Sequence, residues 1–208
     1  MTHLFALFFF TFLAAFIASA PPGLLNVNAA KASVEKGKGN GIIFGLGVAI
    51  MVCFQTYIAV RIAKYLSRNP EVIGMLFKIA LVVFTVLAIF FFLKARKQGD
   101  RPVEFQKGKK FDSFSKGIFL AALNLLTIPY YSGLNTVFHS QGFMNYTVLD
   151  EVIFILAAGS GTFLVMYLYA FYFNKLETKT HRFSKNSNYI LSALMLVLLI
   201  ITLIRICY

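Results

Sequence analysis

FLAAFIASAPPGLLNVN (residues 12–28) and FLAALNLLTIPYYSGLN (residues 119–135) are apolar stretches that proline interrupts, with asparagine nearby. Proline removes a backbone donor and blocks the carbonyl four residues before it, so each stretch should break in mid-course. In a bilayer the freed backbone groups cost several kcal/mol unless they find partners. Broken helices at matching places in two halves of a chain are typical of a transporter's binding site. The pair therefore predicts a small membrane transporter with its site at the breaks.

The composition of the whole chain is that of an integral membrane protein. Hydrophobic residues make up 59% of the 208 residues and charged residues only 13%, against roughly a quarter charged in an average soluble domain. Several apolar stretches are longer than the ~18 residues that cross a bilayer. They lie near residues 4–25, 41–63, 72–93, 117–138, 151–173 and 188–206. The sequence thus predicts a single all-α membrane domain over residues 1–208, with six transmembrane helices.

Basic side chains give the chain a net charge of +12, and their positions predict its orientation. Fifteen of the twenty Lys and Arg lie in the first, third and fifth connections between spans, and the fourth connection has none. The positive-inside rule places these odd-numbered connections in the cytoplasm and both termini outside. Because topology accounts for the surplus charge, we expect a multi-pass protein of the cytoplasmic membrane and no nucleic-acid partner.

The N-terminal stretch resembles a signal peptide only in part. Ala18-Ser19-Ala20 imitates a signal-peptidase site after an apolar run. A positively charged start is missing, because only His3 precedes the run, and the run continues through Leu25. We therefore expect this stretch to be retained as the first span.

Chemistry-bearing residues do not form a catalytic or metal-binding motif. His3, His139 and His181 fall in separate segments, with no spacing typical of metal ligation. Cys53 lies in mid-span and Cys207 near the last residue, which argues against a structural disulfide. A phosphate-binding glycine loop and a nucleophile elbow are both missing from the sequence. The prediction is no enzyme, no cofactor and no metal site.

Two halves of three spans, about residues 1–93 and 117–208, flank the polar, basic segment 94–116. Three spans per half insert the second half in the opposite sense, which predicts a 3+3 inverted repeat with broken helices 1 and 4. One shift along the chain aligns Gly45-Leu46-Gly47 of span 2 with Gly159-Ser160-Gly161 of span 5. We expect segment 94–116 to be the cytoplasmic linker between the repeats.

Glycines in spans 2 and 5 are predicted to pack helices. Small residues four apart on one helical face let two helices approach closely and gain dispersion contacts that lipid cannot supply. The predicted packing glycines are Gly37, Gly41, Gly45, Gly47, Gly159 and Gly161. Exposure of their backbone to a solute is the alternative role.

Two signatures resemble those of the LysE-type amino-acid exporter family. Pro22-Gly23-Leu24 with Asn26 stands where that family closes its first span with Pro-Gly-Pro, before a glycine-rich second span. Phe114-Ser115-Lys116-Gly117 and then Asn124 stand for the family's Phe-x-x-Gly start and its Asn-Pro-Lys element. Leucine replaces the second proline, only the asparagine of Asn-Pro-Lys is present, and Val52 stands where many members have aspartate. The resemblance covers nearly the whole chain in length, span pattern and basic central loop.

The resemblance implies secondary-active export of amino acids or related small solutes across the cytoplasmic membrane, driven by an ion gradient. A metal or ion carrier on the same architecture is one alternative, although such carriers normally need carboxylates inside the membrane. A membrane scaffold without transport is another. The expected partners are a small-molecule substrate, an amino acid above all, and the lipid bilayer, and a homo-oligomer is left open.

The two breaks supply the candidate substrate pathway. A half-helix that restarts after a break offers N–H groups and a positive dipole end to a carboxylate, and carbonyls freed before it can accept from an ammonium group. Opposed broken helices therefore suit a zwitterion, and kinked packing is the alternative. The predicted pathway residues are Pro22, Gly23, Asn26, Asn28, Gln55, Asn124, Thr127, Pro129, Tyr130 and Tyr131. We expect Asn124 and Thr127 to face Asn26 and Asn28 across a polar cavity.

Acidic residues lie only near the ends of the spans. The nearest are Glu35, just after span 1, and Asp150 and Glu151 at the start of span 5. Each is expected to be a solvated end residue, since charged side chains are seldom buried. Glu35 is the candidate group for ion coupling, because a segment that dips back after Pro22 would bring it toward the cavity.

Overall fold

The computed structural model describes residues 2–21, 23–69 and 110–172, with isolated positions at 85, 86, 89, 93 and 196. Every secondary-structure element in these ranges is an α-helix, as predicted. The helices are α1 (Thr2–Ser19), α2 (Leu24–Lys36), α3 (Lys38–Arg68), α5 (Lys110–Ala122), α6 (Thr127–Ser140) and α7 (Val148–Tyr172). Pro22 and almost all of predicted spans 3 and 6 lie outside the described residues.

Four of the predicted spans are found among the described helices. α3 and α7 are long and apolar enough to cross a membrane, and they correspond to spans 2 and 5. The other helices form two bent pairs: α1 and α2 meet at 78°, and α5 and α6 at 65°. Each pair is long and apolar enough to make one broken span. The predicted breaks in spans 1 and 4 are therefore confirmed.

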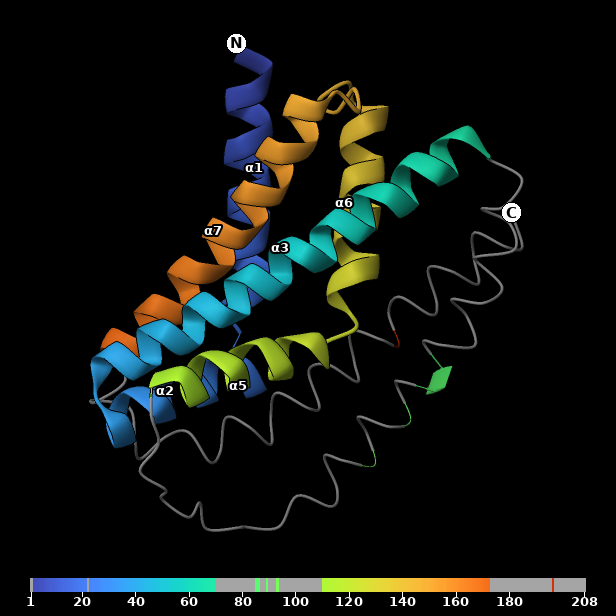
Figure 1. Ribbon diagram of the computed structural model, residues 1–208. Coiled ribbons are helices and arrows are strands. Elements are labelled where there is room, and N and C mark those ends of the chain that lie inside the picture. The colour runs from blue at the N-terminus through green and yellow to red at the C-terminus, as the bar shows by residue number, and fades with distance from the viewer. Residues whose placement is uncertain are drawn as a thin grey trace. The chain divides into compact units, whose positions relative to one another are not determined.

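Two compact units make up the chain, Met1–Tyr65 with Phe105–Glu177, and Leu66–Glu104 with Thr178–Tyr208. Helices from both predicted halves build the first unit. Figure 1 shows α1 and α7 side by side, and α2 beside α5. α1 and α7 run parallel, because His3 lies near Asp150 at their starts and Tyr169 reaches Ala20 toward their ends.

Small residues bring the helices of the first unit into close contact. A β-carbon would overlap an atom of a neighbouring helix at Gly41, Gly45, Gly47, Gly159 and Gly161. Gly37 differs, because it is exposed, has a φ of +89° and has no atom within 4 Å of a β-carbon position. The prediction of helix packing was wrong for Gly37: it forms the turn between α2 and α3, where glycine adopts a positive φ without strain.

Candidate functional site

Side chains from α2 and α7 close the break between α1 and α2. Asn26 Nδ2 donates to the carbonyls of Ser19 and Pro21, both at 2.8 Å. The Tyr169 hydroxyl of α7 donates to the carbonyl of Ala20 at 2.9 Å. These carbonyls follow the last turn of α1, where a helix leaves its acceptors without intrahelical partners. Carbonyls expected to accept from a substrate's ammonium group thus already accept from the protein.

A side chain of α3 closes the break between α5 and α6 in the same way. Gln55 Nε2 donates to the carbonyl of Ala121 at 3.1 Å and to that of Asn124 at 3.3 Å. Gln55 is only 2% exposed, so its amide is withdrawn from solvent and lipid. Gln55, which the sequence predicts to line the substrate pathway, therefore lies at the second break.

Each half of the chain supplies the side chain that closes the break in the other half, an arrangement called here the crosswise closure. The shift that aligns Gly45 with Gly159 also aligns Gln55 with Tyr169. α3 of the first half holds the break of the second half, and α7 of the second half holds the break of the first. Equivalent positions in the two predicted repeats therefore make equivalent contacts.

Glycine packing follows the same crosswise pattern. A β-carbon at Gly47 of α3 would meet the Phe114 carbonyl and the Ile118 amide of α5. A β-carbon at Gly161 of α7 would meet the Phe12 carbonyl and the Phe16 amide of α1. In both cases the contacts are a carbonyl and the amide four residues later. Each long helix thus lies tightly against the first half-helix of the opposite repeat.

Thr162 of α7 links the two broken spans through hydroxyl groups. Ser19 Oγ, at the end of α1, donates to Thr162 Oγ1 at 3.3 Å. The hydroxyl of Tyr131 of α6 also lies near that of Thr162, and both side chains are 3% exposed. The sequence pattern indicates Tyr131 but not Thr162, whose only signal is a hydroxyl next to Gly161 in an apolar helix.

The predicted asparagines and threonine lie at separate breaks. Asn28 Nδ2 donates to the Leu24 carbonyl within α2 at 2.7 Å. Asn124 is exposed between α5 and α6, and Thr127 begins α6 with 8% exposure. Among the described residues no hydrogen bond joins either asparagine of α2 to these two. The residues that connect the breaks are instead the hydroxyl-bearing ones of α1, α6 and α7.

The other predicted pathway residues surround the breaks. Gly23 precedes α2 with φ −125°, an extended conformation open to any residue. Pro129 lies exposed in the first turn of α6. The Tyr130 hydroxyl donates to the Ala14 carbonyl of α1 at 2.9 Å and so joins the two broken spans a second time.

Polar groups without a hydrogen-bond partner lie in the interior of the first unit. Asn135 of α6 is fully buried, and neither its Nδ2 nor its Oδ1 has a partner. The hydroxyls of Thr11 and Thr56 and the Oε1 of Gln55 are also buried and unpartnered. Buried polar groups without partners are rare in native structures and need an explanation. The sequence pattern does not single out Asn135, although it ends the stretch 119–135.

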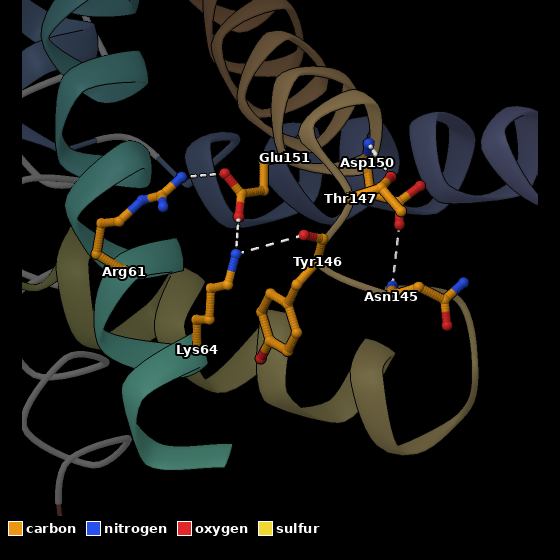
Figure 2. A network of polar contacts seen from close by, with 7 residues as sticks. All are labelled: Arg61, Lys64, Asn145, Tyr146, Thr147, Asp150 and Glu151. Atoms are coloured by element: carbon orange, nitrogen blue, oxygen red, sulfur yellow. Dashed lines mark hydrogen bonds and ion pairs between the residues drawn. The ribbon is translucent and has the colours of Figure 1, made fainter. Parts of the chain in front are cut away.

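A network of ionic contacts holds α3 to the start of α7 (Figure 2). Glu151 forms ion pairs with Arg61 and, at 3.0 Å, with Lys64, which also donates to the Tyr146 carbonyl at 3.4 Å. Beside it, Asp150 accepts from the backbone N–H of Asn145 at 3.0 Å. Both carboxylates come from the first turn of α7, and both cations from the last turns of α3.

The expectation that Asp150 and Glu151 are solvated was wrong. Asp150 is 1% exposed and Glu151 6%. His3 Nε2 at the start of α1 lies 3.1 Å from Asp150 Oδ1, and the basic residues of α3 meet Glu151. Tertiary packing therefore buries the first turn of α7, and paired charges make that burial tolerable.

The Glu151→Gln substitution is expected to destabilise this end of the protein. It leaves Arg61 and Lys64 close together without their shared carboxylate. A fully buried pair broken in this way costs more, but Arg61 is 44% exposed, so we expect a loss of about 1–3 kcal/mol. Thermal unfolding in detergent measures the loss. Adding Lys64→Gln should recover part of it, and equal melting temperatures for Glu151→Gln and wild type would contradict the account.

Glu35, the candidate coupling group, forms an ion pair with a residue of its own helix. Its carboxylate is 3.4 Å from Lys31 Nζ one turn earlier in α2, and its side chain is 10% exposed. Unlike Asp150 and Glu151, Glu35 is therefore partly exposed near the end of its helix. Among the described residues, groups of His, Cys, Asp or Glu able to hold a metal ion are not found.

Comparison with known proteins gives one family match. A family model described as LysE type translocator matches residues 5–205. No curated protein and no solved structure matches the chain. The match spans both bent helix pairs from residue 5 onward and both long helices, so it covers every contact described above except that of His3 with Asp150.

Proposed function

The chain belongs to the LysE type translocator family, and from this premise we propose that it exports amino acids or related small solutes across the cytoplasmic membrane, driven by an ion gradient. Family membership makes the protein a membrane transporter of small solutes. The export direction, the driving force and the amino-acid substrate are the proposal. Glu35, whose carboxylate lies 3.4 Å from Lys31 Nζ in α2, is the proposed coupling group.

The crosswise closure of the two breaks is the observation that carries the proposal. Gln55 holds the break of the second half, and Tyr169 holds the break of the first. If the halves 1–93 and 117–208 rock against each other as inverted repeats, both breaks change together. A single movement would then close the substrate site to one side of the membrane and open it to the other.

Both restarted half-helices lack a side-chain cap, which supports an anionic group in the substrate. The residues before α2 and α6, Gly23 and Leu126, make no capping hydrogen bond. The first N–H groups of α2, those of Leu24, Leu25 and Asn26, therefore stay available to a carboxylate, which the helix dipole also favours. At the start of α6 only the N–H of Ile128 is available, because Thr127 donates to the Asn124 carbonyl at 3.3 Å and Pro129 has no N–H. The carbonyls at both breaks already accept from Asn26, Tyr169 and Gln55. An ammonium group would instead meet hydroxyls and aromatic rings.

The distribution of charge over the first unit supports the proposed orientation. Lys36 at the end of α2, Lys38 at the start of α3 and Lys116 in α5 gather toward one end. The α6–α7 connection, residues 141–147, has no Lys or Arg and lies toward the other end, near the N-terminus. Arg61 and Lys64 also lie at that end, where they are paired with Glu151. The positive-inside rule assigns the lysine-rich end to the cytoplasm.

Cysteine labelling in whole cells tests this orientation. In a background without Cys53 and Cys207, Ser140→Cys is expected to react with an impermeant thiol reagent added outside. Gly39→Cys is expected to react only after the membrane is opened. Both positions are exposed, and a β-carbon at Gly39 meets no atom within 4 Å, so neither change should disturb folding. The reverse labelling pattern would refute the orientation.

Transport by the purified protein in lipid vesicles tests the proposed function. Efflux of labelled amino acids and of divalent metals is measured with and without a proton gradient. We expect efflux of at least one amino acid, accelerated by the gradient, and none of a metal. Metal efflux would favour the ion-carrier alternative, and no efflux of any solute would favour a scaffold.

A further inference from the structure

Asn135 is buried in α6 with its whole amide unpartnered. It is 0% exposed, and neither Nδ2 nor Oδ1 makes a hydrogen bond. Its neighbour Thr136 shows the usual solution, a bond from its hydroxyl back to the Ser132 carbonyl at 2.9 Å. A buried amide without a hydrogen-bond partner destabilises the fold. If this position served packing alone, leucine would therefore be more stable there than asparagine. The amide therefore indicates a ligand.

The position of Asn135 connects it to the two breaks. Thr127, Tyr131 and Asn135 are four residues apart on one face of α6, and all three are buried. Tyr131, one turn before Asn135, lies near Thr162, which accepts a hydrogen bond from Ser19 at the first break. Asn135 thus follows directly on the hydroxyl chain that links the broken spans.

Thr56 of α3 is a second unpartnered group in the same interior. Its side chain is 0% exposed, and its Oγ1 has no hydrogen-bond partner. Its neighbours on α3, Val52 and Ala59, belong to one buried cluster with Tyr131 and Phe154. On α6, both Tyr131 and the residue one turn after Asn135, Phe138, pack their rings against Phe154, at 6.1 and 6.2 Å. Asn135 on α6 and Thr56 on α3 therefore both lie next to members of the same buried cluster.

The helix segments around Asn135 and Thr56 are electrically neutral where the structure describes them, and the buried carboxylates Asp150 and Glu151 lie beyond them, at the start of α7. Asp, Glu, Lys and Arg do not occur in the described segments 4–21, 23–30, 41–60, 117–138 and 152–172. A solute with a net charge would lose its hydration there without meeting a counter-charge from these segments. A solute whose own charges cancel avoids that cost, and its polar groups can pair with amides, hydroxyls and helix N-termini.

We infer that Asn135, together with Thr56, binds the transported solute, and that this solute is a net-neutral amino acid with an uncharged side chain. The inference rests on the proposed function and assigns its specificity. The amide offers two donors and an acceptor, enough to contact a carboxylate or hydroxyl and an ammonium group at once. A cationic or anionic amino acid carries one charge that this site leaves unpaired.

Exchange across vesicle membranes tests the assignment. Labelled serine, lysine and glutamate are each offered to vesicles loaded with the same unlabelled solute, which removes any need for a driving ion. Wild type is expected to exchange serine at least about tenfold faster than lysine or glutamate, and Asn135→Leu to lose about tenfold in serine exchange. Asn135→Asp should lose serine exchange and gain lysine exchange. Asn145→Leu, at an exposed position outside the helices, is the matched control and should behave as wild type.

Thermal unfolding separates a substrate contact from a structural one. Without solute, Asn135→Leu should melt at or above the wild-type temperature, because it removes an unpartnered amide. Serine should raise the melting temperature of wild type but not of Asn135→Leu. A lower melting temperature for Asn135→Leu without solute, or undiminished serine exchange, would overturn the role of Asn135 alone. Lysine exchange as fast as that of serine would overturn neutrality, and no exchange of any amino acid by wild type would overturn the proposed function itself.

Discussion

The Gly161→Val substitution is expected to prevent α1 from docking on α7. A β-carbon at Gly161 overlaps the Phe12 carbonyl of α1 and lies 2.9 Å from the β-carbon of Ala15. The overlap is with backbone, so no flexible side chain can turn aside to relieve it. The cost should therefore reach or exceed about 3 kcal/mol, the upper end of ordinary overpacking. Gly47→Val should separate α3 from α5 for the same reason, since it overlaps the Phe114 carbonyl.

Gly133→Val provides a matched control for both substitutions. Gly133 lies exposed in α6, and a β-carbon there meets no atom within 4 Å. The measurement is the folded, monodisperse fraction of detergent-extracted protein, together with its melting temperature. We expect both packing variants to lose most of the folded fraction and Gly133→Val to retain it. Wild-type behaviour of Gly161→Val would show that α1 does not pack against this glycine.

Local chemistry explains which features of the fold can be predicted from the sequence. Proline interrupts a helix at any position beyond its first turn, and an uncharged apolar run of sufficient length indicates a membrane span. The breaks in spans 1 and 4 and the long helices α3 and α7 follow from these two rules. Glycine spacing likewise predicts close packing at Gly41 and Gly45. The same spacing also predicts packing at Gly37, where the chain turns instead.

Tertiary contacts explain what the sequence does not reveal. Tyr169 and Ala20 are 149 residues apart, and the sequence around either residue does not predict their hydrogen bond. From its position at the start of a helix, Glu151 is predicted to be solvated. In the structure it is buried, because α3 brings Arg61 and Lys64 next to it. Weakly polar residues in apolar helices are frequent, so their neighbours in space decide whether they have a role.

Gln55→Leu and Tyr169→Phe are expected to slow transport strongly while leaving the fold assembled. Gln55→Leu removes the donor that serves the carbonyls of Ala121 and Asn124, and Tyr169→Phe removes the donor to Ala20. Each carbonyl left unpaired costs about 1–3 kcal/mol, and the cost falls on the breaks, where the halves must move. We expect transport to fall at least about tenfold in each variant. The controls are Tyr167→Phe on α7 and Gln141→Leu in the exposed connection after α6, which should retain wild-type rates.

Initial efflux of labelled serine from vesicles, at matched protein abundance, is the most direct test of the crosswise closure as the transport mechanism. We expect Gln55→Leu and Tyr169→Phe to remain monodisperse yet to release serine at least about tenfold more slowly than wild type, Tyr167→Phe and Gln141→Leu. Wild-type efflux rates in both Gln55→Leu and Tyr169→Phe would contradict this mechanism, and the two breaks would then be kinks in packed helices.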